Sequence, residues 1–232
     1  MMPLKGKTRY IFFDADDTLW ENECYFREAE HRFALLLSSY AAPGQTAEIL
    51  ARKQEENIPI FGYGSKTYLI GMLDAAVEIC GDRFSKEIYI KAKEIIQELA
   101  YHEFHLMPDI EEVLKALHGT YRLAVATKGD LLEQMTKYRE SGLEKYFHHI
   151  EVMERKSEED YRHMAAKLDI RPEEILMVGN SVKSDIAPVI SIGGMAIHVP
   201  HKVTWAHEMM DIPASDRVIE VKNIKEILGF LL

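Results

Sequence analysis

Cysteine is scarce in this sequence, and basic residues are outnumbered by acidic ones, 28 to 38. Its 232 residues include two cysteines, Cys24 and Cys80, and no CxxC pair, so the pattern favours neither a disulfide framework nor a zinc site. The formal net charge of −10 disfavours a surface built for nucleic acid or anionic lipid, because both partners require a basic face. We therefore expect no nucleic acid polymer and no membrane among its partners, and a monomer or homodimer.

Long hydrophobic runs are also missing. No apolar stretch approaches the roughly 18 residues that a membrane-spanning helix requires. The N-terminal apolar run is too short, and too soon followed by Asp14, to be a signal peptide. These absences and the scarce cysteine predict a cytoplasmic location. Hydrophobic residues still make up 47% of the chain, which is enough for a packed core.

Short β-type runs alternate with helical stretches from about residue 106 to the C-terminus. Such alternation predicts an α/β fold, a Rossmann-like three-layer core in which helices cover both faces of a parallel sheet. A further strand of the same buried type precedes the rest. We expect strands at Tyr10–Phe13, Leu123–Ala126, Ile150–Met153, Ile175–Val178 and Ala196–Val199, and helices near 109–118, 129–141 and 158–168.

The segment from residue 22 to residue 105 is helical in pattern throughout. Apolar residues recur there at spacings of three and four, with breaks at Pro43-Gly44, Pro59–Gly64 and Gly81. We expect a helical-bundle domain over 22–105, inserted into an α/β domain made of 1–21 and 106–232. Two linkers, near Trp20–Glu23 and His105–Asp109, would act as a double hinge.

Polar side chains gather where the predicted strands end. Ligands of parallel α/β sheets bind beyond the carboxyl ends of the strands, at the point where strand order reverses. Carboxylates placed so close together are costly unless a cation, a shared proton or a reacting group compensates them. We therefore predict a site that includes Asp14, Asp16, Thr18, Thr127, Lys128, Lys156 and the run Gly179–Asp185.

Four motifs stand in a fixed order along the chain: Asp14-x-Asp16-x-Thr18, Thr127, Lys156 and Gly179-Asn180-Ser181-x-x-x-Asp185. Their order resembles that of the haloacid dehalogenase superfamily, most of whose members are Mg²⁺-dependent phosphatases. The resemblance covers the whole chain. It includes the helical insert, which is similar to the superfamily's cap between the first and second motifs.

The resemblance implies a role for each residue. Asp14 would attack phosphorus and form an aspartyl-phosphate, while Asp16 would protonate the leaving oxygen and then activate water. Mg²⁺ would be held by the Asp14 carboxylate, the Asp16 backbone carbonyl and Asp185, with water completing its octahedron. Thr127 would grip a phosphoryl oxygen, and Lys156 would offset the charge that accumulates on the phosphoryl group.

The match departs from the commoner pattern at two positions. Asn180 stands where most relatives have an acid, so it would ligate the metal weakly or through water, and Asp185 would carry more of the charge. Asp17 replaces a frequent glycine and is expected to hydrogen-bond within its loop instead of acting as a third acid. Thr18 and Lys128 are candidates for substrate binding, although Thr18 could instead tie down the loop after the first strand.

Each role has a simpler alternative. Asp14 and Asp16 could cap the next helix, and Thr127 could be the N-cap of the helix that begins near residue 130. Lys156 lies among acidic residues, where a lysine is usually solvated, and Arg155 is the alternative cation.

The insert and the C-terminal region contain further candidates. Within the segment 60–66, Tyr63 and Lys66 could contact the leaving group, although the segment could equally be an ordinary turn. His198, His201 and the stretch Trp205–Glu208 resemble a metal group in composition, but packing and capping explain them adequately.

The function implied is a Mg²⁺-dependent phosphomonoester hydrolase that acts on a small phosphorylated metabolite. The carboxylate at Asp16 favours phosphoryl chemistry over dehalogenation, because a departing halide needs no acid. A phosphomutase or a pyrophosphatase of the same superfamily is the alternative, and a non-catalytic protein that binds a phosphorylated ligand is the alternative from another class. Candidate substrates are nucleoside monophosphates, sugar phosphates and phosphoglycolate.

Overall fold

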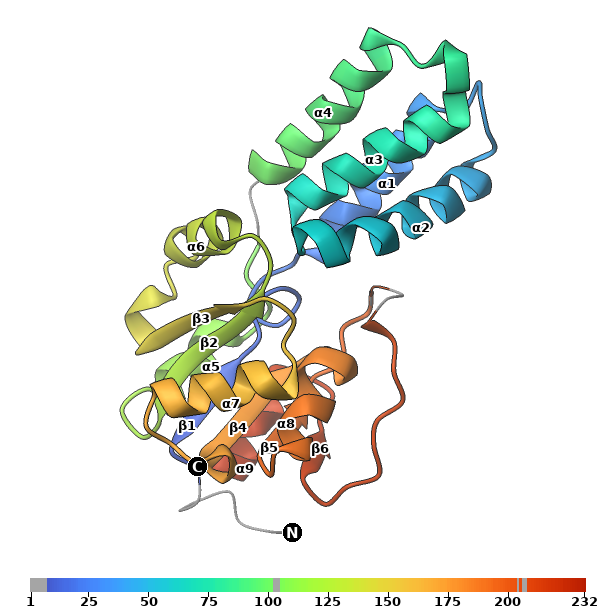
Figure 1. The fold of residues 1–232 in the computed structure, drawn as a ribbon. Helices are drawn as coiled ribbons and strands as arrows, with labels where there is room; N and C mark the ends of the chain where they lie inside the picture. Colours follow the sequence, from blue (N-terminus) through green and yellow to red (C-terminus); the bar gives the residue numbers. More distant parts are fainter. Residues whose placement is uncertain (1–7, 102–104, 204, 206–207) are drawn as a thin grey trace. The chain divides into compact units, whose positions relative to one another are not determined.

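The computed structural model describes residues 8–101, 105–203, 205 and 208–232 (Figure 1). The chain divides into two compact units. One consists of Met1–Glu23, Phe104–Lys128 and Gln134–Leu232, and the other of Cys24–Glu103 and Gly129–Glu133. Among the residues that the structure describes, no helix is both long and apolar enough to cross a membrane.

A six-stranded sheet lies at the centre of the first unit, and its strands are all parallel, in the order β3-β2-β1-β4-β5-β6. The chain fills one half of the sheet outward from β1 and then returns to fill the other half, so the strand order reverses at β1. The strands are β1 (Tyr10–Phe13), β2 (Arg122–Lys128), β3 (His149–Met153), β4 (Ile175–Gly179), β5 (Met195–His198) and β6 (Val218–Glu220). Five of the six were predicted, while the three-residue edge strand β6 is too short to leave a pattern.

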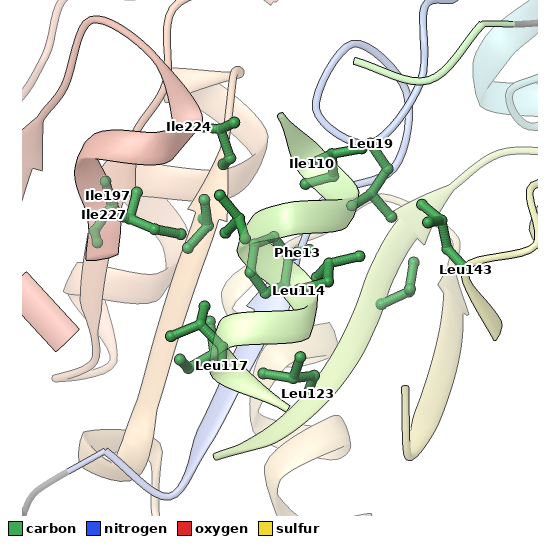
Figure 2. Packing of buried hydrophobic residues seen from close by; sticks show 14 of the residues in the cluster. Phe13, Leu19, Ile110, Leu114, Leu117, Leu123, Leu143, Ile197, Ile224 and Ile227 are labelled. Atoms are coloured by element: carbon green, nitrogen blue, oxygen red, sulfur yellow. The ribbon is translucent and has the colours of Figure 1, made fainter. Parts of the chain in front are cut away.

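Helices cover both faces of this sheet, which confirms the predicted three-layer α/β fold. Alternate residues of β1 point to opposite faces, so Ile11 and Phe13 join one hydrophobic cluster while Tyr10 and Phe12 join the other. Figure 2 shows the first cluster, in which Leu114 of α5 packs close to Phe13. The helices and short helical turns are α5 (Ile110–Leu117), α6 (Leu131–Glu140), η2 (Glu144–Tyr146), α7 (Glu158–Lys167), η3 (Pro172–Glu174), the π-helical turn η4 (Val182–Ile186), α8 (Ala187–Ser191), η6 (Ile224–Ile227) and α9 (Leu228–Leu231).

The second unit is a helical bundle. Its helices are α1 (Glu23–Leu36), α2 (Pro43–Phe61), α3 (Ser65–Cys80) and α4 (Lys86–Tyr101), with a short turn η1 (Gly81–Arg83). Apolar side chains at helical spacing, such as Phe33, Leu50 and Met72, form its core. Pro59, expected to break the helix, instead lies in the last turn of α2. The helix ends two residues later, before Gly62 in a left-handed conformation (φ 77°).

The two linkers run side by side. Trp20 and Leu106 form an antiparallel bridge, and the Glu21 N–H donates to the His105 carbonyl at 2.9 Å. Trp20 is fully buried in the core of the first unit. The hinge role of these linkers stays a prediction.

Candidate active site

Asp14 lies at the carboxyl end of β1, where the strand order reverses. The whole of β1 is buried, and the Asp14 N–H donates to the Val178 carbonyl of β4 at 2.9 Å. The Asp14 side chain is 10% exposed. Parallel α/β folds bind ligands at this position of the sheet, so the backbone alone places this carboxylate where a ligand would be expected.

Lys156 joins Asp14 to Asp185. Its ammonium donates to Asp14 Oδ1 and, at 2.6 Å, to Asp185 Oδ1. Lys156 is 2% exposed, so its interpretation as a solvated surface residue is wrong. Its backbone is left-handed, with φ 58°, a conformation that costs a non-glycine residue about 1 kcal/mol. The next residue, Ser157, is the N-cap of α7.

Asp185 is fully buried in the π-helical turn after β4. Its Oδ2 accepts from the Ser181 N–H at 3.0 Å. Gly179, the last residue of β4, makes room for it, because a Cβ at position 179 would lie 2.7 Å from the Asp185 Cβ and closer still to its carboxyl group. The glycine of the fourth motif is therefore a steric requirement of Asp185.

The charges of Asp14, Lys156 and Asp185 affect one another's pKa values. Burial and the neighbouring Asp185 raise the pKa of Asp14 to about 7, against the opposing effect of Lys156. Burial disfavours the charge of Lys156, but the two carboxylates raise its pKa, so its side chain is an ammonium at neutral pH. Two carboxylates thus share one cation.

Asp16 faces three donors. Its Oδ1 accepts from Trp20 Nε1 at 2.8 Å and Lys137 Nζ at 3.1 Å, and its Oδ2 accepts from Gln134 Nε2 at 2.8 Å. Burial raises the pKa of Asp16, but Lys137 and these hydrogen bonds lower it below its ordinary value overall. The structure therefore holds Asp16 as a carboxylate, the form of a general base. Gln134 and Lys137 were not predicted as site residues. The sequence shows only that they are polar and three residues apart on the helix after the second motif.

Thr18 and Asn180 complete this end of the sheet. The Thr18 hydroxyl lies 3.4 Å from Asp14 Oδ2 and 3.3 Å from Asn180 Oδ1, so it contacts side chains as well as holding its loop. Thr127 is buried near the end of β2. It does not cap the next helix, because Asp130 Oδ1 accepts from the Glu133 N–H at 3.1 Å at the start of α6.

Asp17 serves its own loop. Its carboxylate accepts from the N–H groups of Asn22 (2.9 Å) and Glu23 (3.1 Å), which open α1. Its φ of 61° is a left-handed conformation, which glycine adopts at less cost than aspartate. The expected hydrogen bonding within the loop is confirmed.

Lys128 is engaged by a residue that the sequence analysis assigned to packing. Its ammonium pairs with Glu208 and donates to Ser184 Oγ at 2.9 Å. Burial raises the pKa of Glu208, but Lys128 and two serine hydroxyls together lower it to about 2. Of the nearby histidines, His198 contacts the Asn180 carbonyl (3.1 Å) and His201 the Val203 carbonyl (2.8 Å), while His207 lies outside the described residues.

The donor set suits a hard divalent cation. Asp14, Asp185 and Asn180 offer side-chain oxygen atoms, which is the ligand type that Mg²⁺ prefers. Within the described part of the chain, no group of three or more His, Cys, Asp or Glu could hold a metal. A magnesium ion would therefore take its remaining ligands from the Asp16 carbonyl and from water.

Tyr63 and Lys66 belong to the second unit. Tyr63 lies in the turn between α2 and α3, and Lys66 pairs with Asp130 of the same unit at 2.8 Å. Ser65, the first residue of α3, donates to Glu133 at 2.9 Å, and Gly129–Glu133 group with this unit. The contact of Tyr63 and Lys66 with substrate stays a prediction.

Comparison with known proteins gives consistent matches. Residues 8–193 match the family described as haloacid dehalogenase-like hydrolase. A haloacid dehalogenase-like family hydrolase from Xanthomonas campestris is 30% identical, with a TM-score of 0.87 over 97% of this chain and 93% of that one. A 2-haloacid dehalogenase from Pseudomonas syringae is 21% identical, with a TM-score of 0.62 over 97% and 98%. The N-acylneuraminate-9-phosphatase of Rattus norvegicus is 22% identical over 234 residues, which cover 96% of this chain and 92% of the relative.

Proposed function

The chain belongs to the haloacid dehalogenase-like hydrolases, and we propose that it hydrolyses a phosphomonoester of a small metabolite through an aspartyl-phosphate at Asp14. One observation carries the proposal. A buried lysine, Lys156, joins two buried carboxylates at the point where the strand order reverses, and no structural need accounts for this arrangement.

Asp14 is the nucleophile. One of its carboxylate oxygens attacks phosphorus, the bond from phosphorus to the leaving oxygen breaks, and an acyl phosphate forms on Asp14. Lys156 lies against the same carboxylate and offsets the charge of the phosphoryl oxygens during the transfer. When bound, Mg²⁺ would add Lewis-acid stabilisation of the phosphoryl group, held by Asp14, Asp185, Asn180 and the Asp16 carbonyl.

Asp16 handles the protons. In the first step it gives a proton to the leaving oxygen, and in the second it takes one from the water that attacks the acyl phosphate. Its present partners stabilise the ionised form, so it exchanges some of them for the substrate when it carries the proton. Dehalogenation has no need for such a group, which favours the phosphatase over the dehalogenase.

The substrate is a small phosphorylated metabolite, and we place phosphorylated sugar acids first because of the name of the rat relative. Phosphomutase and pyrophosphatase activities use the same residues and would differ in what accepts the phosphoryl group. A cytoplasmic location fits such a metabolite and stays a prediction.

Hydrolysis of p-nitrophenyl phosphate with and without Mg²⁺ tests the proposal. Wild-type protein should hydrolyse p-nitrophenyl phosphate only with Mg²⁺, and Asp14→Asn should be inactive. Asp216→Asn, the same change at an exposed position, should have the activity of wild type. Turnover without metal, or turnover that survives Asp14→Asn, would contradict the mechanism. A panel of phosphorylated metabolites, ranked by kcat/KM, then identifies the substrate.

A further inference from the structure

Glu208 is a buried carboxylate that the proposed mechanism does not use. It lies on the loop between β5 and β6 and is 9% exposed, whereas the next two residues, Met209 and Met210, are 72% and 51% exposed. Burying a carboxylate is costly unless it is paired and hydrogen-bonded, and a surface loop offers it an easy route to water. The abrupt change in exposure therefore indicates that specific contacts hold Glu208 inside.

Those contacts form a closed network. Glu208 Oε1 pairs with Lys128 Nζ, and Oε2 accepts from Ser181 Oγ and, at 2.6 Å, from Ser184 Oγ. Ser184 Oγ in turn accepts from Lys128 Nζ at 2.9 Å, and Ser181 Oγ accepts from the Ser184 N–H at 3.0 Å. Each serine hydroxyl donates once and accepts once, so both hydroxyls are satisfied within the network.

The network joins two strand ends that do not touch in the sheet. Lys128 ends β2, while Ser181 and Ser184 belong to the turn after β4, and β1 lies between these strands. The same turn carries Asp185. Glu208 therefore ties together the two flanks of the strand that ends in Asp14.

We propose that Glu208 is a positioning residue of the phosphate site, which holds the Lys128 ammonium and the turn of Asp185 at a fixed spacing around Asp14. Its charge also offsets the repulsion between Lys128 and Lys156, two ammonium groups that interact at this end of the sheet. The inference rests on the proposed phosphatase function, because that function gives Lys128 its part in phosphate binding.

The test compares Glu208→Gln with Asp211→Asn, a removal of one negative charge at an exposed position of the same loop. Glutamine preserves the shape of the side chain but removes the charge that orients Lys128. We expect Glu208→Gln to raise both KM for p-nitrophenyl phosphate and Kd for inorganic phosphate, the latter measured by calorimetry with Mg²⁺, about tenfold. The change in kcat should be smaller, because binding in the ground state is what is lost.

Glu208→Asp should recover part of the affinity, since it restores the charge one methylene short. Lys128→Met should raise the same Kd, and combining it with Glu208→Gln should add little, because both changes remove one interaction. Additive effects, or a Glu208→Gln protein that matches Asp211→Asn in Kd and KM, would overturn the inference. A loss of stability towards urea with an unchanged Kd would overturn it too, by assigning Glu208 a structural role alone.

The two proposals fail separately. If wild-type protein hydrolyses p-nitrophenyl phosphate and Glu208→Gln does not weaken phosphate binding, the positioning role is wrong and the phosphatase function stands. If wild-type protein has no turnover but Glu208→Gln weakens phosphate binding, the phosphatase function is wrong, and Glu208 positions a phosphate-binding site that does not hydrolyse its ligand.

Discussion

Replacing Gly179 with alanine should damage the site and the fold together. Gly179 lies in β4, paired with His198 of β5, and its φ is not in the left-handed region, so the backbone itself tolerates alanine. The obstacle is space. An added Cβ would lie 2.7 Å from the Asp185 Cβ and nearer still to its carboxyl group, whereas such contacts below 3.0 Å are essentially never found.

The size of the effect follows from how firmly Asp185 is held. Its carboxylate has no exposed surface and accepts from Lys156 at 2.6 Å and from the Ser181 N–H at 3.0 Å. Overpacking alone costs about 1–3 kcal/mol, and disrupting a buried ion pair costs about 3–5 kcal/mol when one partner is lost. Because Asp185 moves but remains, we expect Gly179→Ala to lower the free energy of unfolding by about 2–4 kcal/mol.

Urea unfolding, followed by fluorescence and circular dichroism, measures this loss, with the m-value checked for constancy. Gly229→Ala is the matched control, since a Cβ at position 229 meets nothing within 4 Å. Gly229 lies in α9, where alanine is favoured over glycine by up to about 1 kcal/mol. If Gly179→Ala unfolds at the same urea concentration as Gly229→Ala and keeps Mg²⁺-dependent turnover, the steric argument for Asp185 is wrong.

Three further predictions concern single side chains. Lys156→Met leaves Asp14 and Asp185 as uncompensated buried carboxylates, so the free energy of unfolding in urea should fall by about 3 kcal/mol and turnover at least about 100-fold. A variant as stable as wild type would contradict the ion-pair description. Asp17→Ala should be less stable than Asp17→Gly by about 1 kcal/mol, because both variants lose the cap of α1 but only alanine is strained at φ 61°. Equal urea midpoints of the two variants would refute this. Glu208 has its pKa lowered from 4.5 to about 2 by folding, so its contribution is complete above pH 4.5 and is lost as the pH falls to about 2. Urea titrations should therefore show wild type losing about 2–3 kcal/mol more than Glu208→Gln between pH 5 and pH 2, a figure below the full shift because about half of the Glu208 carboxylates in the folded protein are still ionised at pH 2.

Much of the core could be predicted because its signals are local. A short apolar run predicts a strand such as β1, and apolar residues at spacings of three and four predict the helices of the insert. Helix α7 begins at Glu158, as predicted, and there Ser157 Oγ accepts from the Asp160 N–H at 3.2 Å. Family membership, predicted from four ordered motifs, is confirmed as well.

Contacts between residues far apart in the sequence could not be predicted. Lys137 reaches Asp16 across 121 positions of sequence, and Glu208 reaches Lys128 across 80. Neither pair has a local pattern, since a lysine on a helix or a glutamate on a loop is normally solvated. Only the closing of the sheet brings these side chains into the same buried space.

Apolar periodicity was enough to predict the succession of strands and helices along the chain, because it depends on residue type and on spacing within a few positions. The roles of Asp14 and Asp16 came instead from the resemblance of four motifs, which lie between residues 14 and 185, to a known family. The tertiary structure alone decided that Lys156 is buried between two carboxylates 142 and 29 positions away, that Asp16 is held in its ionised form, and that Glu208 engages Lys128. Charge and burial depend on what surrounds a side chain in space, and in this sheet those surroundings come from separate strand ends.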